Sequence, residues 1–242
     1  MFTAFDWDVI RRTAPYLVRE GMTFTLTLTA LAMTGGIVFS TLLAMMLLSS
    51  FRPMSMIAGG YVNLMRSIPL VLVIFWFFFL VPYIGAWILR EPNPIKVGAW
   101  MSSLITFTMF EAAYYCEIMR AGIQSLPRGQ QMAGTALGLS LPQTYRYVLL
   151  PMAFRIVLPP LTSEFLNIIK NSSVALTIGL LELTGRARAM QEFSFRVFEA
   201  FTAATVIYLL TNLIVVLAMR ALEKKVRVPG LISAAGAPMA GH

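Results

Sequence analysis

Long uncharged stretches alternate with short polar ones along this chain of 242 residues. Residues 21–50 contain no charged side chain, and as a helix with a rise of about 1.5 Å per residue this stretch crosses a hydrocarbon core of about 30 Å. Its first part, TFTLTLTA (23–30), alternates like a β-strand, but it continues into a non-alternating apolar run. We therefore interpret the whole stretch as the first membrane-spanning helix.

Four more apolar runs follow the first. The second is divided at Pro69, the third carries Glu111 and Glu117, and the fourth is interrupted by Pro159 and Pro160. The last run is uncharged over residues 200–219 and ends in a basic cluster. The sequence predicts an all-α integral membrane protein with five spans, at about 21–49, 56–82, 97–119, 152–176 and 198–220.

Charge sets the predicted orientation. Five spans put the two termini on opposite sides of the membrane, and Lys and Arg favour the cytoplasmic side. The basic residues of the last span and of the loop at 120–151 place the C-terminus inside and the N-terminus outside, although three arginines near the N-terminus oppose this. The predicted organisation is a periplasmic segment (1–20), a membrane domain (21–220) with a cytoplasmic loop (120–151), and a basic cytoplasmic tail (221–242).

Composition supports a membrane protein and argues against several other classes. Hydrophobic residues make up 58% of the chain and charged residues 12%, with a mean hydropathy of +0.75. The net charge of +8 is scattered among the spans, so no nucleic-acid partner is expected. Cys116 is the only cysteine and His242, at the last position, the only histidine, which argues against a metal site or an intramembrane enzyme.

One segment inside the predicted cytoplasmic loop is neither apolar nor featureless. AGTALGLSLPQTYRYVLLP (133–151) contains the pair Gly134 and Gly138 in a GxxxG spacing, but its polar flanks exclude it from lipid. We predict a helix that ends at Gly138 and a second helix that begins near Pro142. Two short helices meeting at a glycine form a compact projection that can enter a groove on another protein, and a solvated loop is the alternative. A channel, which composition alone leaves open, does not account for such a projection.

The same segment resembles the cytoplasmic signature of ABC importer permeases. That signature has a small-residue triplet, three residues, a glycine, nine residues, and an ending of aliphatic, any residue, Leu, Pro. Here the glycine is Gly138 and the ending is VLLP (148–151), but the triplet, usually Glu-Ala-Ala, reads Met-Ala-Gly from Met132. NLMRSIPLVLVIFW (63–76) and LPPLTSEFLNIIKNSSVALTIGLLEL (158–183) also resemble the polar amino acid (His/Glu/Gln/Arg) permease branch, most closely permeases of bacterial glutamate/aspartate importers.

The resemblance implies a type I ABC importer permease in the bacterial inner membrane, and it implies partners. A dimer of separate ATPase subunits would bind ATP and Mg²⁺, and the chain itself, which would hold no cofactor, contains no G-x-x-x-x-G-K-[ST] phosphate-binding loop. A second homologous permease or a second copy would complete the membrane part. A periplasmic amino-acid-binding protein would contact the connector at 90–96 and a loop at 182–196. The residues implied to couple to the ATPase are Met132, Ala133, Gly134, Gly138, Leu139, Ser140, Gln143 and Arg146.

The resemblance further implies ATP-driven transport of glutamate or aspartate from periplasm to cytoplasm, with glutamine or a basic amino acid as the alternative substrate. Charged side chains within spans usually face the interior of a helix bundle. Lys170, which amides surround, suits an acidic substrate, although it can serve packing or gating instead. Glu117 and Arg120 are expected to form an i, i+3 structural pair. The candidate substrate-path residues are Lys170, Asn167, Asn171, Ser172 and Glu164.

Overall fold

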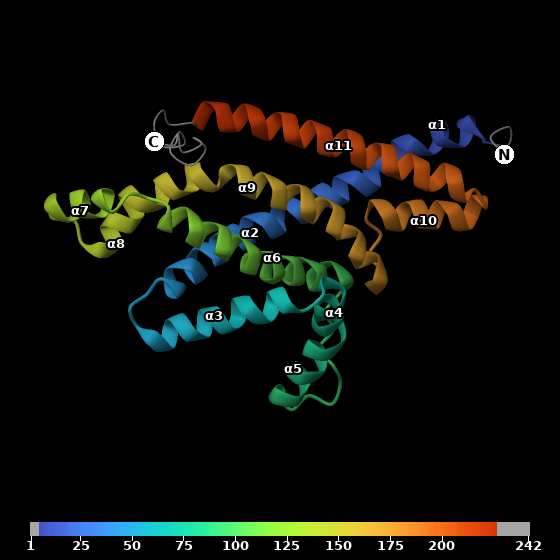
Figure 1. Cartoon of the computed structure of the whole chain (residues 1–242). Helices are drawn as coiled ribbons and strands as arrows, with labels where there is room; N and C mark the ends of the chain where they lie inside the picture. Colours follow the sequence, from blue (N-terminus) through green and yellow to red (C-terminus); the bar gives the residue numbers. More distant parts are fainter. Residues whose placement is uncertain (1–4, 227–242) are drawn as a thin grey trace.

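The computed structural model describes residues 5–226, which form helices and turns with no β-strand among them (Figure 1). Four long helices run side by side along the molecule: α2 (Thr23–Leu47), α6 (Ala99–Gln124), α9 (Leu150–Asn171) and α11 (Val197–Val226). Helices α7 (Arg128–Ala136) and α8 (Leu141–Thr144) project at one end, whereas α1 (Trp7–Tyr16) and α10 (Leu183–Ser194) lie at the opposite end. The all-α prediction is confirmed for these residues.

The first helix is longer than the predicted span. Helix α1 (Trp7–Tyr16) continues through a π-helical turn (Leu17–Met22) into α2 (Thr23–Leu47) without a break. It begins so early because the side chain of Asp6 accepts hydrogen bonds from the backbone N–H groups of Asp8 and Val9, which caps the helix. The residues of the predicted periplasmic segment from Trp7 onward are therefore helical and continuous with the first span.

The predicted span at 56–82 is not one helix. Helix α3 (Arg52–Ser67) ends before α4 (Leu70–Phe75), which continues through a π-helical turn (Trp76–Leu80) into α5 (Val81–Leu89). Ile68 between them is extended, with φ −111° and ψ 135°, because a proline at the next position disfavours the helical conformation. The chain turns there; Val73 and Ile74 of α4 are buried against α6, and α5 extends away from the bundle (Figure 1).

Four helical stretches of the described residues are long and apolar enough to cross a membrane: Trp7–Leu47, Leu70–Leu89, Leu141–Ile178 and Val197–Val226. The predicted third span lies in α6 (Ala99–Gln124), which is long enough but carries two glutamates, an arginine and four Ser and Thr residues. Because α6 is not among the four, the number of five spans stays a prediction, as does the orientation of the termini.

Continuous helix joins the predicted loop at 120–151 to the predicted span at 152–176, and the membrane boundary between them stays a prediction. After α7 (Arg128–Ala136), a single helical stretch comprises α8 (Leu141–Thr144), a π-helical turn (Tyr145–Leu149), α9 (Leu150–Asn171) and a 3₁₀ turn (Ser172–Ile178). Pro159 and Pro160 lie inside α9 and do not end it, contrary to the predicted interruption. Val157 and Leu161 on either side of them are buried in the main core, and this packing holds the helix in place where proline removes backbone hydrogen bonds.

The predicted external loop at 182–196 is mostly helix. The side chain of Glu182 is fully buried and accepts a 2.9 Å hydrogen bond from the N–H of Gly185, which starts α10 (Leu183–Ser194). Tyr208 donates a 2.8 Å hydrogen bond to the same carboxylate, so Glu182 ties α10 to α11 (Val197–Val226) and is not available to a partner. Of the predicted tail, residues 221–226 belong to α11 and the rest lies outside the described residues.

The core sits where α6 packs between α2 and α9. A Cβ atom at Gly36 of α2 would lie 3.2 Å from Cε2 of Tyr115 on α6, and one at Gly122 of α6 would overlap Val157 of α9. Ala112 and Ala153 are also fully buried in this core. Small residues bring helix backbones close together in membranes, where packing replaces the hydrophobic driving force of water.

We expect Gly122→Val to destabilise the protein by about 1–3 kcal/mol, because the added side chain must push α9 away from α6. Gly60→Val is the matched control, since no heavy atom lies within 4 Å of a Cβ built at that position in α3. Unfolding of both variants in detergent measures the difference. Equal losses of stability would contradict the close packing of α6 and α9.

Candidate functional site

The residues implied to couple to an ATPase form a helical projection, here named the α7–α8 projection (residues 128–149). Helix α7 ends in a Schellman motif, in which the N–H of Gly138 donates to the carbonyl of Thr135 at 2.9 Å and that of Leu139 donates to the carbonyl of Gly134 at 3.1 Å. Gly138 has a φ of +76°, a conformation that glycine adopts without a steric cost. The predicted turn at Gly138 is confirmed.

Ser140 and Gln143 have a local role in this projection. The N–H of Ser140 donates a 2.8 Å hydrogen bond to Oε1 of Gln143, and the N–H of Gln143 donates to Oγ of Ser140 at 3.4 Å. This reciprocal capping box begins α8. Gly134 is the buried contact between the two helices, since a Cβ there would lie 2.8 Å from Oγ1 of Thr144. Residues of the sequence signature thus form the hydrogen bonds and the close helix contact that fold the projection.

The projection exposes several large apolar side chains although its sequence is polar overall. Met132 is 64% exposed, Leu137 79% and Leu141 60%. Behind Leu141 a cavity of about 870 Å³ separates the projection from the corner between α2 and α3, with Tyr145 and Arg146 in its wall. Exposed apolar side chains at the tip of a projection make it a candidate contact surface.

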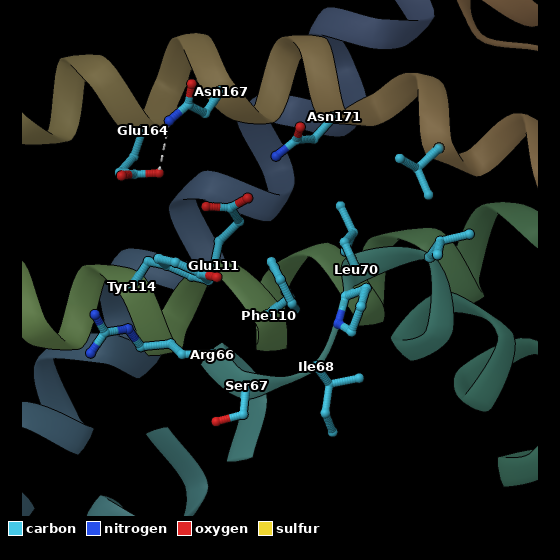
Figure 2. A pocket seen from close by; sticks show the side chains of 13 residues that line it. Arg66, Ser67, Ile68, Leu70, Phe110, Glu111, Tyr114, Glu164, Asn167 and Asn171 are labelled. Carbon is cyan, nitrogen blue, oxygen red and sulfur yellow. Dashed lines mark hydrogen bonds between the residues drawn. The ribbon is translucent and has the colours of Figure 1, made fainter. Parts of the chain in front are cut away.

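A second candidate site is a pocket of about 670 Å³ between α6, α9 and the break that separates α3 from α4. It is named the central pocket. Figure 2 shows Glu164, Asn167 and Asn171 of α9 on one side, facing Glu111 and Tyr114 of α6 on the other. The lining residues are Arg66, Ser67, Ile68, Pro69, Leu70, Val71, Phe110, Glu111, Tyr114, Glu164, Asn167, Asn171 and Val174.

The charges of the central pocket are only partly neutralised. Glu111 is 2% exposed, and its Oε2 has no hydrogen-bond partner within residues 5–226. Glu164 accepts a 3.4 Å hydrogen bond from Nδ2 of Asn167. Arg66 lies with its Cζ 5.6 Å from the ring centre of Tyr114. A buried polar atom without a partner is costly, so Glu111 is a candidate for contact with a group that forms hydrogen bonds.

The structure brings three of the five predicted substrate-path residues together and leaves two apart. Glu164, Asn167 and Asn171 line the central pocket. Lys170 is exposed and does not line the pocket, whereas Ser172 is buried and donates a 2.8 Å hydrogen bond to the carbonyl of Ile169. On a helix, Lys170 points about 100° away from its neighbour Asn171, which explains why adjacent residues differ. A role for Lys170 stays a prediction.

Arg66 and Tyr114 are pocket residues that the sequence reasoning missed. Arg66 interrupts two apolar segments next to Pro69, and this charge at a helix break was the available signal. Glu117 lies one helical turn after Tyr114 on α6. It makes the predicted ion pair with Arg120 at 2.6 Å and a weaker 3.9 Å contact with Arg66. Arg66 is therefore held near the pocket by Glu117 and Tyr114.

The helix bundle thus carries a polar pocket and a projection at one end, and its sequence matches a family of membrane transport subunits. The sequence profile described as "Binding-protein-dependent transport system inner membrane component" matches residues 36–228. The chain belongs to this family, whose members are transport subunits of the inner membrane and not enzymes.

Individual relatives agree with this assignment. The chain is 45% identical over 175 residues to "Glutamate/aspartate import permease protein GltJ" of Escherichia coli K12, covering 70% of this chain and 71% of the relative. It is 30% identical to "Glutamine transport system permease protein GlnP" of the same strain, over 93% of this chain and 99% of the relative. A solved structure, "Crystal structure of an amino acid ABC transporter with histidines", superposes with a TM-score of 0.79 at 27% identity, over 92% and 99% of the two chains. The predicted resemblance to amino-acid ABC permeases is confirmed.

We expect Gly134→Val to loosen the α7–α8 projection without unfolding the bundle, because its side chain would overlap Thr144. A packing loss of about 1–3 kcal/mol predicts hydrogen exchange that is roughly 5- to 150-fold faster over residues 128–149. The same substitution at Gly129 of α7, where a Cβ meets nothing within 4 Å, is the control. Unchanged exchange in Gly134→Val would show that the two helices do not depend on this contact.

Proposed function

We propose that this chain is the permease subunit of an ATP-driven importer that moves glutamate or aspartate from the periplasm to the cytoplasm. The substrate class is supported by the named glutamate/aspartate relatives, GltJ at 45% identity and "Glutamate/aspartate import permease protein GltK" of Escherichia coli O157:H7 at 38% over 86% of this chain and 92% of the relative. The chain itself performs no chemistry. It changes between conformations that open the central pocket to one side of the membrane or the other.

The α7–α8 projection is the proposed contact with the ATPase subunit. The observation that carries this assignment is the exposed apolar surface of Met132, Leu137 and Leu141 on a segment whose flanks are polar. The usual acidic residue of the signature is replaced by Met132, so we propose that this position contributes apolar contact where relatives use charge. ATP and Mg²⁺ belong to the ATPase dimer, and no cofactor is assigned to this chain.

A second permease subunit and a periplasmic binding protein complete the proposed complex. The central pocket is lined from α3, α4, α6 and α9 of one chain, and most of its α9 side chains are only half-buried, so another subunit can close it. Helix α5 stands away from the bundle and exposes Tyr83 (63%) and Trp87 (80%) to lipid or to that subunit. The connector at 90–96 follows α5 directly. All its residues are exposed, as a surface that receives a binding protein must be, and burial begins with the partly buried Val97.

The central pocket is complementary to the part that all amino acids share. Arg66 suits an α-carboxylate, and the carboxylates of Glu111 and Glu164 suit an α-ammonium group. A second carboxylate, as in glutamate or aspartate, would be repelled by both glutamates. We propose that the acidic side chain is selected mainly by the binding protein and by the second permease.

Glutamine is the second candidate substrate, and the same two carboxylates favour it. Its side-chain amide is neutral, donates hydrogen bonds and is not repelled by Glu111 or Glu164. The 30% identity to a glutamine permease over 93% of the chain supports this candidate independently. A basic amino acid shares the electrostatic argument, and the solved structure named above is of an amino acid ABC transporter with histidines.

Reconstitution of the complete complex in liposomes tests the proposal. We expect ATP-dependent uptake that rises when the binding protein carries glutamate or aspartate. Uptake that responds to glutamine alone would favour the second candidate, and flux without ATP would show a channel and contradict both.

In the same preparation, Gly138→Asp is expected to lose at least about tenfold in uptake and in co-purified ATPase, because the contact surface would have to desolvate a charge. Gly138→Asn is the matched control, since Asn and Asp have the same size and both tolerate a positive φ. If the two variants behave alike, backbone strain explains the loss and the contact does not involve this turn.

Glu111→Gln is expected to reduce uptake at least about tenfold while the complex still assembles, because a hydrogen bond to a charged group is worth about 1.5–3 kcal/mol. The reduction should be similar for glutamate and for glutamine if Glu111 binds the shared ammonium group. Glu20→Gln, at a half-exposed position remote from the pocket, is the control for loss of one carboxylate. Unchanged uptake kinetics in Glu111→Gln would remove the central pocket from the transport path.

A further inference from the structure

A basic cavity lies between α9 and α11, away from the central pocket. Its volume is about 590 Å³, and Arg155 of α9 faces Arg220 and Lys224 of α11 across it. The end of α11 lies at the same end of the molecule as the α7–α8 projection (Figure 1). Arg220 directly follows the uncharged run at 200–219, which places the cavity at the membrane boundary. Neither the transport proposal nor the coupling proposal uses these residues.

The cavity has an excess of positive charge. Arg155, Arg220 and Lys224 make no ion pair within residues 5–226, and all three are exposed. Glu223 is the one carboxylate of the lining, and its Oε1 accepts a 3.0 Å hydrogen bond from the hydroxyl of Thr162 on α9. One acidic group against three cations leaves about two positive charges without a counter-ion, and residues 227–242 contain no Asp or Glu that could supply one.

The rest of the lining is apolar and continues toward the membrane. Leu158, Pro159 and Leu217 complete the cavity wall. Leu217 is 57% exposed, and Leu213, one helical turn further into the span, is 51% exposed. The exposed face of α11 next to the cavity is therefore apolar. A ligand that fits carries negative charge at one end and an apolar chain at the other.

We propose that this cavity binds the phosphate headgroup of an anionic phospholipid, with the acyl chains lying along Leu217 and Leu213 of α11. Guanidinium groups bind phosphate through paired hydrogen bonds, and Arg155 and Arg220 reach it from two different helices. Basic cavities between membrane helices at a headgroup level are a known type of lipid site. Since Glu223 already joins α11 to α9, the lipid strengthens an existing contact between these helices.

The site is tested on the purified complex by equilibrium binding of fluorescent phosphatidylglycerol, with phosphatidylcholine as the neutral lipid. Each cation near a membrane surface contributes about a fivefold factor in affinity for an anionic lipid. Arg155→Gln/Arg220→Gln is therefore expected to weaken phosphatidylglycerol binding roughly 25-fold and to leave phosphatidylcholine binding unchanged. The control Arg52→Gln/Lys225→Gln removes the same charge from positions that do not line the cavity, and it should bind phosphatidylglycerol like the parent.

Three results would overturn the proposal. Equal weakening in the control pair would mean that net charge alone attracts the lipid. Displacement of phosphatidylglycerol by inorganic phosphate at millimolar concentration would mean that the cavity holds free phosphate and that the acyl chains contribute nothing. Loss of the ATPase subunit from Arg155→Gln/Arg220→Gln, with lipid binding unchanged, would mean that the cavity contacts that protein. This test measures lipid binding and not transport. A failure of the lipid site can therefore be distinguished from a failure of the transport proposal.

Discussion

The close approach of α6 to its two neighbours is the constraint on which the other features depend. Gly36 allows α2 to lie against Tyr115, and Gly122 allows α9 to lie against α6. In lipid, water does not drive helices together, so backbone proximity and side-chain packing must do so. This packing also fixes the rotation of α6 and α9. With Gly122 turned toward Val157, Glu111 is turned toward the α9 face that carries Glu164 and Asn167, and the central pocket results.

A second feature of the structure is that one continuous helical stretch connects the projection to the pocket. Helix α8 and helix α9 belong to one helical stretch, Leu141–Ile178, so the surface proposed to contact the ATPase and the residues Glu164, Asn167 and Asn171 lie on one continuous helical element. Pro159 lies between them and lacks an N–H group, so the backbone is most easily bent there. This arrangement provides a physical route for the proposed coupling, in which movement of α8 would rotate or bend α9 and alter the pocket wall.

Much of this architecture could be predicted from local sequence, and the exceptions have physical reasons. Gly138 and the helices around it followed from the special backbone conformation that glycine allows, which is a local property. The end of α3 near Pro69 also has a local cause, but whether the chain continues straight or turns depends on packing against α6, which the sequence pattern does not contain. The local sequence at Pro159 predicts an interrupted helix. Burial of its neighbours in the core keeps α9 helical there, and this packing cannot be seen in the sequence pattern.

The site was predicted less completely than the fold because a pocket joins residues that are distant in sequence. Asn167 and Asn171 are four residues apart and share a face of α9, so finding one favours finding the other. Lys170 is adjacent to Asn171 in sequence yet lies on a different face, and its charge, not its position, made it attractive for an acidic substrate. Arg66 reaches the pocket only because the chain turns after Ser67, which places it beside Tyr114.

The charge of the pocket bears on where specificity resides in the proposed importer. Two glutamates and one arginine form a poor site for a ligand with two carboxylates, yet the relatives at 45% and 38% identity are named for glutamate and aspartate. The two observations are compatible if the pocket in this subunit binds the ammonium and α-carboxylate groups and does not select the side chain. A transport path needs a site weak enough to release its cargo, and repulsion between Glu111 or Glu164 and an acidic side chain lowers the affinity there. In that arrangement the repulsion favours release, while the binding protein supplies the affinity that begins transport.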